Sequence, residues 1–341
     1  MPLFTESQTI YEKAIAKQIC DSDLDTVISW PEKELSLLFA ATDQIRRHFH
    51  HNMVDPCAIM NIKSGGCSED CAFCTQSAHN TAAVNVQKLS DADEIIAHHH
   101  QAHAHGLKFG VVSSGKRLTR EQIITIAEAL KSCNDHLHAS LGLLGDEEFA
   151  ILRDAGVVCY NHNLETSKRF FPRIVTTHTW EQRVETVKRA KKAGMAVCSG
   201  GIFGLGEQWQ DRKELALELA RLDVDTIPIN FLNAIPGTRI GKPAETPLDF
   251  LKIVALFRIA LPDKNIKVCG GREINLGRLQ PLMFYAGANG YISGDYLTTS
   301  GDRVESDDAL VASLGLQKQG EQNHSAQIRA ARAADNGAQS R

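Results

Sequence analysis

Three cysteines lie close together in the stretch SGGCSEDCAFCTQS (64–77), at Cys67, Cys71 and Cys74, and we refer to them as the triplet. Thiolates at this C-x3-C-x2-C spacing can bind three irons of a cubane cluster and leave the fourth iron without a protein ligand. An open coordination position is where a substrate or cofactor can bind, as in catalytic zinc sites. The alternative is a structural zinc loop, for which His79 is the nearest fourth ligand. The spacing alone leaves both kinds of metal site open.

Composition narrows the class of protein that carries this segment. The chain has 341 residues, a net charge of -4 and 9 cysteines. Its scattered basic residues argue against a nucleic-acid partner, and no run of about 18 apolar residues predicts a membrane span. The first residues also lack the apolar core of a signal peptide. We therefore expect a cytoplasmic protein, in which cysteines serve as metal ligands, catalytic groups or buried thiols rather than as disulfides.

Short apolar segments alternate with amphipathic helical patterns along most of the chain. The pattern predicts strands over residues 57–63, 108–114, 136–142, 157–163, 196–202, 226–232, 266–271 and 289–294. Helical patterns such as 119–133 and 179–194 lie between them, and the second ends at Gly194. This alternation predicts an α/β fold, a (β/α)8 TIM-type barrel with its working face at the carboxyl ends of the strands. We expect an N-terminal helical cap over 1–35, the barrel over 36–315 and a disordered polar tail over 316–341.

Several predicted strands carry polar side chains at the spacing of a barrel interior. Residues two apart on a strand share a face, so two sets are expected to point the same way: Cys159 with Asn161 and Asn163, and Cys57 with Asn61 and Lys63. An ordinary barrel interior is filled with Val, Ile and Leu. Amides, thiols and a lysine in their place predict a polar ligand bound deep inside. The histidine run HHHQAHAH (98–105) falls on a predicted helix and is expected to be a surface feature.

The triplet follows the first predicted strand, and Phe73 directly precedes its last cysteine, an arrangement that resembles the radical S-adenosylmethionine (SAM) superfamily. The motifs IKSGGCSEDCAFCTQS, YNHNLETS, VCSGGIFGLGE, PINFL and GGRE narrow the resemblance to the biotin synthase family, over about residues 35 to 315. The resemblance implies a [4Fe-4S] cluster on the triplet, with SAM on its fourth iron. It implies that a 5'-deoxyadenosyl radical abstracts hydrogen and that sulfur is inserted into dethiobiotin, which is the activity of a radical SAM sulfurtransferase.

The resemblance also assigns roles to individual residues. Asn161, Asn163 and Asn230 would hydrogen-bond SAM or the ureido ring of dethiobiotin, and Lys63 would approach the carboxylate end of the substrate or the mouth of the site. Cofactor contacts are implied for Glu165 at the SAM ribose, for Phe73 as a shield of the cluster, and for the glycine-rich turn with Gly204, Gly206 and Glu207 at the methionyl part of SAM. The implied partners are dethiobiotin, a flavodoxin- or ferredoxin-type electron donor, and a second copy of the chain in a homodimer.

The sequence departs from the family at a second, auxiliary cluster. The family's usual [2Fe-2S] ligands, three cysteines and one arginine, align here with Gly110, His138, Cys198 and Lys267, so only Cys198 is kept. Four cysteines on predicted strands, which we call the inner cysteines, are expected to replace the lost ligands: Cys57, Cys159, Cys198 and Cys269. Four thiolates suit a four-iron cluster, with an additional sulfide as the donated atom.

The departure at the auxiliary cluster keeps two other functions open. One is a radical SAM relative that acts on a different small molecule without donating sulfur, such as a hydrogenase-maturation or amino-acid mutase type. The other is a zinc-loop binding protein without redox chemistry.

Overall fold

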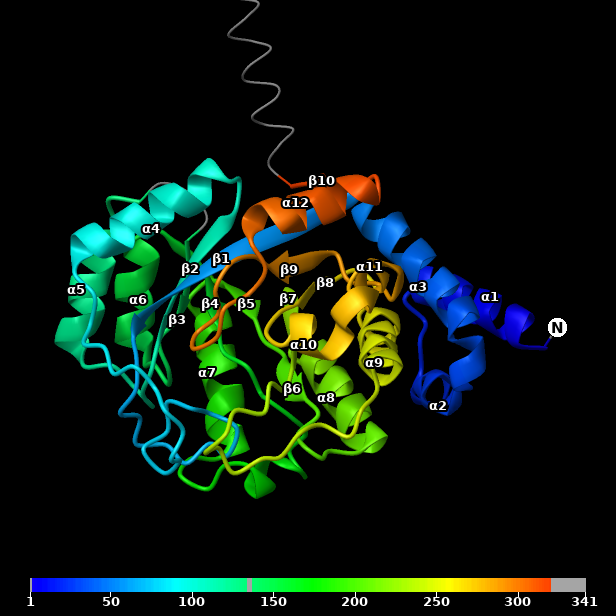
Figure 1. The fold of residues 1–341 in the computed structure, drawn as a ribbon, viewed down its shortest axis with the longest axis horizontal. Coiled ribbons are helices and arrows are strands. Elements are labelled where there is room, and N and C mark those ends of the chain that lie inside the picture. The colour runs from blue at the N-terminus through cyan, green and yellow to red at the C-terminus, as the bar shows by residue number, and fades with distance from the viewer. Residues whose placement is uncertain (1, 134–136, 320–341) are drawn as a thin grey trace, which may run out of the picture.

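Nine parallel strands form a closed barrel in a computed structural model that describes residues 2–133 and 137–319 (Figure 1). Neighbouring strands follow the order β1-β2-β3-β4-β5-β7-β8-β9, and β9 pairs with β1 to close the ring. The strands are β1 Met53–Lys63, β2 Lys108–Ser113, β3 Leu137–Ser140, β4 Val157–Asn161, β5 Ala196–Cys198, β6 Gly201–Phe203, β7 Thr226–Phe231, β8 Asn265–Val268 and β9 Gly290–Ile292.

Each predicted strand overlaps an observed one, and the predicted (β/α)8 barrel is confirmed. The fifth strand position of the barrel is divided into two short strands, β5 and β6, and both pair with β7. Gly200 lies in this break, where a Cβ atom would stand 2.0 Å from the carbonyl oxygen of Pro228. Only glycine permits this close approach of the two chain segments.

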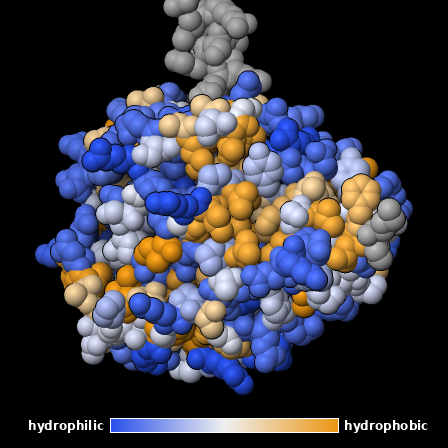
Figure 2. Space-filling view, turned by 45° about the vertical axis from the view of Figure 1, so that its right-hand side comes forward, coloured by the Kyte–Doolittle hydropathy of each residue, from blue (hydrophilic) through white to orange (hydrophobic). Residues whose placement is uncertain are grey.

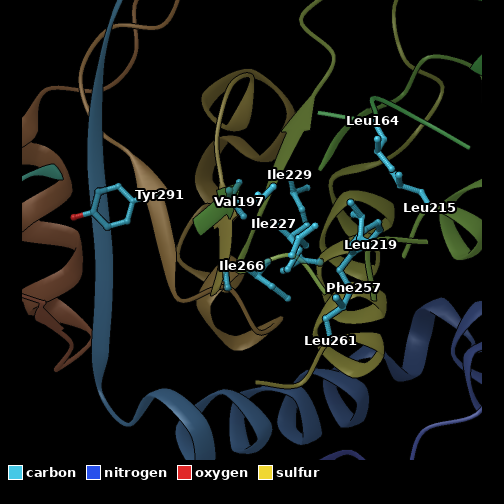
Figure 3. Packing of buried hydrophobic residues seen from close by; sticks show 14 of the residues in the cluster. Leu164, Val197, Leu215, Leu219, Ile227, Ile229, Phe257, Leu261, Ile266 and Tyr291 are labelled. Atoms are coloured by element: carbon cyan, nitrogen blue, oxygen red, sulfur yellow. The ribbon is translucent and has the colours of Figure 1, made fainter. Parts of the chain in front are cut away.

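Helices cover the outside of the barrel and bury the outward side chains of the strands. They are α4 Ala92–Ala104, α5 Arg120–Leu130, α6 Asp146–Asp154, α7 Trp180–Lys192, α8 Trp209–Arg221 and α9 Pro247–Ala260. In Figure 3, Ile227 and Ile229 of β7 gather with Leu219 of α8 and Phe257 of α9 in the layer between sheet and helices. Because side chains alternate along a strand, residues such as Thr226 and Pro228 must face the barrel axis.

The chain termini pack around this barrel. Helices α1 Pro2–Ile15, α2 Asp21–Ser29 and α3 Leu35–His50 lie beside α9, with the short turn η1 Glu32–Glu34 between α2 and α3 (Figure 1). After β8 come α10 Arg272–Leu276, α11 Leu282–Tyr285 and, beyond β9, α12 Val304–Ser313. Strand β10 Gln317–Lys318 then pairs with the start of β1. The predicted disordered tail therefore begins with paired residues, and positions 320–341 of it lie outside the described residues.

Hydrophilic side chains cover most of the face shown in Figure 2, with hydrophobic surface gathered around its centre. Within residues 2–133 and 137–319, no helix has the length and apolar character needed to cross a membrane. The histidine run lies on α4 as predicted, but its expected exposure is wrong for His99. That ring is buried against Phe109, with 5.6 Å between the ring centroids, because it faces the barrel rather than solvent.

Candidate functional site

The triplet lies on the loop that follows β1, at the mouth formed by the carboxyl ends of the strands. Hydrogen bonds within the loop fold it back on itself, from the Cys67 amide to the Gln76 carbonyl at 3.0 Å and from Ala78 to the Cys67 carbonyl at 2.8 Å. The Asn80 amide group donates to the carbonyls of Cys71 and Cys74, at 3.1 and 2.8 Å. The loop backbone is therefore fixed by its own residues before any metal is considered.

Asp70, which directly precedes Cys71, ties the triplet loop to residues 176 and 177. Its carboxylate accepts hydrogen bonds from the backbone amides of Thr176 at 2.8 Å and Thr177 at 3.2 Å, and from both hydroxyls. Burial alone favours the neutral acid, but these hydrogen bonds outweigh it and lower the pKa of Asp70. An ionised, fully bonded carboxylate of this kind anchors the triplet loop to the opposite side of the mouth.

The triplet thiols are close enough to influence one another. Burial is the main cause that raises the pKa of Cys71 to about 12; the charge of Arg183 opposes this effect, and negative charge on Cys74, Glu165 or Cys67 adds to it. Burial also raises the pKa of Cys74, and thiols of this kind become thiolates when a cationic iron centre replaces their protons. The donor set, three half-buried cysteines on an anchored loop, therefore fits a cluster that leaves one iron open.

The zinc alternative required His79 as a fourth ligand, and the structure turns this side chain elsewhere. His79 is exposed, and its Nε2 lies 3.1 Å from the carbonyl oxygen of Ser68. Among the described residues, no three His, Cys, Asp or Glu side chains are placed as a group that could hold a single metal ion. The geometry therefore gives the zinc loop no fourth ligand at His79.

Glu165 lies just inside the mouth in a backbone conformation that is rare for a residue with a side chain, with φ at +70°. Its carboxylate is buried, with Oε1 3.4 Å from the Arg183 guanidinium and Oε2 without a hydrogen-bond partner. Burial raises the pKa of Glu165, and the charge of Arg183 opposes this. A strained, buried carboxylate with one free oxygen is suited to accept a hydrogen bond from a ligand hydroxyl.

The glycine-rich turn after β6 is held by contacts of its own residues. Gly204 and Gly206 both have positive φ angles, of +92° and +94°, and a Cβ on Gly204 would meet Pro243 at 2.9 Å. Because Gly204 has no Cβ atom, Pro243 can pack directly against its backbone. Glu207 uses both carboxylate oxygens within the turn, on the amides of Gly204 at 3.1 Å and Leu205 at 2.8 Å. This glutamate holds the shape of the turn.

The three asparagines differ in how much of each amide group is left free. Asn230 bridges two neighbouring strands, donating to the Gly201 carbonyl at 3.2 Å and accepting from the Gly270 amide at 3.1 Å. The Oδ1 of Asn163 accepts from the Gly200 amide at 3.2 Å. Asn161 has only a weak contact from the Cys159 thiol at 3.8 Å. Asn161 therefore has the side chain most available to a ligand.

A cavity lies deeper in the barrel, and three of the four inner cysteines line it together with Asn161, His138 and Lys267. The inner cysteines in its wall are Cys57, Cys198 and Cys269. Cys159 is buried beside them, and negative charge on it raises the pKa of Cys198. Burial raises the pKa of each of the four thiols, to about 12 for Cys159. Four thiols around one cavity, near a buried ammonium group, are a donor set that fits an iron-sulfur cluster.

The positions that align with the family's usual auxiliary ligands are neighbours in this barrel. Gly110 pairs with His138 across β2 and β3, and both line the cavity with Cys198 and Lys267. The Lys267 ammonium lies 3.0 Å from an Asp55 carboxylate oxygen, and both side chains are 4% exposed. The four aligned positions therefore lie together around one cavity, although two of the family's cysteines are absent.

Near the mouth, a chain of charged side chains lies behind the triplet, and no sequence pattern predicted it. The His178 ring lies 2.6 Å from the Glu69 carboxylate, and Arg183 donates to the other ring nitrogen at 3.1 Å. Arg183 also donates to the Asn163 carbonyl at 2.7 Å. The sequence signal that could have indicated this chain was the pair of acidic residues, Glu69 and Asp70, between the first two cysteines of the triplet. The other residues are too far away in the sequence to be paired by inspection.

Comparison with known protein families gives two matches, which follow one another along the chain. The family model described as Radical SAM superfamily matches residues 61–219, and that described as Biotin and Thiamin Synthesis associated domain matches residues 228–317. Biotin synthase of Geobacter sulfurreducens is 48% identical over 290 residues, which are 83% of this chain and 88% of the relative. Biotin synthase of Geobacter metallireducens is 47% identical over 286 residues, which are 82% and 87%.

Solved structures resemble the barrel at lower sequence identity. Methylornithine synthase superimposes with a TM-score of 0.81 at 20% identity, covering 93% of this chain and 99% of that chain. A maturase of the [FeFe]-hydrogenase gives 0.78 at 17% identity, covering 93% and 76%. At these identities the likeness concerns the fold alone.

Proposed function

Because this chain belongs to the biotin synthase family of radical SAM enzymes, we propose that it inserts sulfur into dethiobiotin to form biotin. The observation that carries the proposal is the presence of two separate cysteine groups in one barrel, the triplet at the mouth and the inner cysteines around the deep cavity. Cys57 precedes Lys63 by six residues on β1, so the two levels are about 20 Å apart along the strand. Ring closure between two saturated carbons needs a group that abstracts hydrogen atoms on one side of the substrate and a sulfur source on the other.

At the mouth, the triplet would hold a [4Fe-4S] cluster whose open iron takes SAM. Together they supply the 5'-deoxyadenosyl radical that removes hydrogen from unactivated carbon. Glu165, with its unpaired Oε2, would accept hydrogen bonds from the SAM ribose. Phe73, half-buried against the core, would limit water near the cluster. Gly204, Gly206 and Glu207 shape the turn that faces the methionyl part of SAM, with Glu207 as a positioning residue.

Between the two levels, the half-buried asparagines would hold the ureido ring. An amide both donates and accepts, which matches the N–H and carbonyl groups of that ring. Asn161 and Asn163 lie on and just after β4, and Asn230 lies on β7, on the other side of β5 and β6. Lys63, at the end of β1, would approach the carboxylate end of the substrate or the mouth of the site. Fixing the ring in this way keeps the reacting C–H bonds near the radical and excludes water.

At the bottom, the inner cysteines would hold a four-iron auxiliary cluster that supplies the sulfur, with Cys198 at the one position shared with the family's usual ligands. Replacing two C–H bonds of dethiobiotin by two C–S bonds requires two hydrogen abstractions and therefore two SAM molecules. The structural neighbours at 20% identity or below show the fold alone and do not favour a relative that acts without sulfur donation. The relatives that share 44% identity or more are named biotin synthase.

The proposal includes the partners that such an enzyme needs. Electrons for SAM cleavage would come from a flavodoxin- or ferredoxin-type donor in the cytoplasm. A second copy of the chain would complete a homodimer, for which the hydrophobic area in Figure 2 is a candidate surface. Light scattering at several protein concentrations tests the dimer independently of the chemistry.

The decisive experiment is anaerobic incubation of the reconstituted protein with SAM, a reductant and dethiobiotin. We expect biotin and 5'-deoxyadenosine in a ratio of one to two. Serine replacement of each inner cysteine should remove about four irons per chain and abolish biotin, while SAM cleavage persists at the triplet. Cys133→Ser is the matched control, because that buried thiol follows α5 outside the barrel. If all four variants keep parental iron and biotin, the inner cysteines are core residues and the sulfur has another source.

A further inference from the structure

Lys267 is the only buried cation that projects into the deep cavity among its described lining residues. It lies on β8 at an inward position, since its neighbours Ile266 and Val268 belong to the hydrophobic layer behind the strand. Its ammonium is 3.0 Å from Oδ2 of Asp55, and Lys108 lies 2.9 Å from the other oxygen of that carboxylate. The Lys108 side chain is 30% exposed, so the two lysines differ in their access to water.

The same ammonium group faces the inner cysteines. It lines the deep cavity together with Cys57, Cys198 and Cys269, and its charge lowers the pKa of Cys57 against the effect of burial. It acts in the same direction on Cys159, Cys198 and Cys269. All four candidate thiolates therefore lie within the electrostatic reach of one fixed positive charge.

We propose that Lys267 is a positioning residue for the auxiliary cluster: held as an ammonium by Asp55, it donates a hydrogen bond to the cluster's sulfur ligands, offsets their negative charge and is not itself an iron ligand. This inference rests on the proposed function, because it needs a cluster on the inner cysteines. An ammonium has three donors and no lone pair, so it cannot replace the arginine ligand of related enzymes as an electron-pair donor. The salt bridge to Asp55, at 3.0 Å, fixes the position of this side chain beside the cavity.

The consequence is a definite effect on redox equilibrium. Reduction adds negative charge to a cluster that is already anionic, and net charge and hydrogen bonds to sulfur are what set its potential. A buried ammonium stabilises the reduced form more than the oxidised form. Removing it should make the cluster harder to reduce, whereas the more exposed Lys108 should matter less because water screens it.

The test uses full-length protein in which all three triplet cysteines are alanine, so that any bound iron belongs to the inner site. In this background Lys267→Met should retain about four irons and show at least a tenfold weaker tendency to be reduced, which is about 59 mV to more negative potential for one electron. Lys267→Arg should restore most of the parental potential. Lys108→Met is the control and should shift it less. The double variant Asp55→Asn/Lys267→Met removes the ion pair as a unit, and should show the same negative shift if the single variant does not fold.

Three results would count against this assignment. An unchanged potential in Lys267→Met, at parental iron content, overturns the charge-compensating role. A ligand-strength nitrogen coupling in the electron paramagnetic resonance spectrum of 15N-lysine-labelled protein shows coordination by Lys267 and also overturns it. Absence of iron in the triplet-free parent removes the auxiliary cluster itself, so failure of the proposed function is distinguishable from failure of this inference.

Discussion

Asn161 and Asn230 offer a sharp comparison between ligand binding and structural support, because the structure gives their amide groups different partners. Asn161 lines the deep cavity and has only the 3.8 Å contact from the Cys159 thiol. Asn230 has two backbone hydrogen bonds that join neighbouring strands. Replacing Asn161 with alanine should therefore weaken ligand binding at little cost to stability, whereas replacing Asn230 should also destabilise the fold.

The magnitudes follow from these contacts. Loss of Asn161 leaves buried polar groups of the bound ureido ring unpaired, at about 1–3 kcal/mol, or about 5- to 150-fold in dissociation constant. Its cost to the free energy of unfolding should stay within about 0.5 kcal/mol. Loss of Asn230 removes two hydrogen bonds worth about 0.5–1.5 kcal/mol each, so unfolding should be easier by about 1–3 kcal/mol.

Anaerobic titration calorimetry with dethiobiotin in the presence of SAM measures the first quantity, and urea denaturation measures the second. Iron content serves as the control and should equal that of the parent in both variants. The reasoning is refuted if Asn161→Ala binds dethiobiotin and SAM as tightly as the parent. It is equally refuted if Asn161→Ala destabilises the chain as much as Asn230→Ala does.

Two further predictions concern the mouth of the barrel. Alanine at any one triplet cysteine should abolish reductive SAM cleavage, because a cubane held by two thiolates is labile; parental yields of 5'-deoxyadenosine from any such variant contradict the assignment. Asp70→Asn should lower the free energy of unfolding of the metal-free protein by about 1.5–3 kcal/mol at pH 7, since it removes a charged acceptor of several hydrogen bonds. The folded pKa of Asp70 is lowered, so its stabilisation is complete above the unfolded pKa of about 3.9 and is lost as the pH falls through the folded value. Urea denaturation from pH 7 to pH 3 should show the difference between parent and variant narrowing below about pH 4, and a constant difference would contradict this account.

Much of the fold could be predicted from the sequence, because the relevant signals are local. Alternation of apolar segments and amphipathic helices identified all eight strand positions of the barrel. Gly194 follows the end of α7 with φ at +81°, as its position in the sequence indicated. Period-two spacing also placed Asn161 on the same inward face as Cys159. These inferences depend only on neighbours a few residues apart, whose geometry the backbone of a strand or helix fixes.

The sequence by itself determined which donor atoms are available at the mouth, since the triplet places three thiols on one loop, while the spacing left iron and zinc both open. Only the tertiary structure decided which side chains share a partner. Glu69 meets His178, 109 residues away, and Asp55 of β1 meets Lys267 of β8. The tertiary structure also places Pro243 against Gly204, and it pairs both carboxylate oxygens of Glu207 with backbone amides of the turn. Such contacts depend on strand register and on closure of the barrel, which bring distant residues to one level of the axis, and no local pattern of residue types encodes that distance.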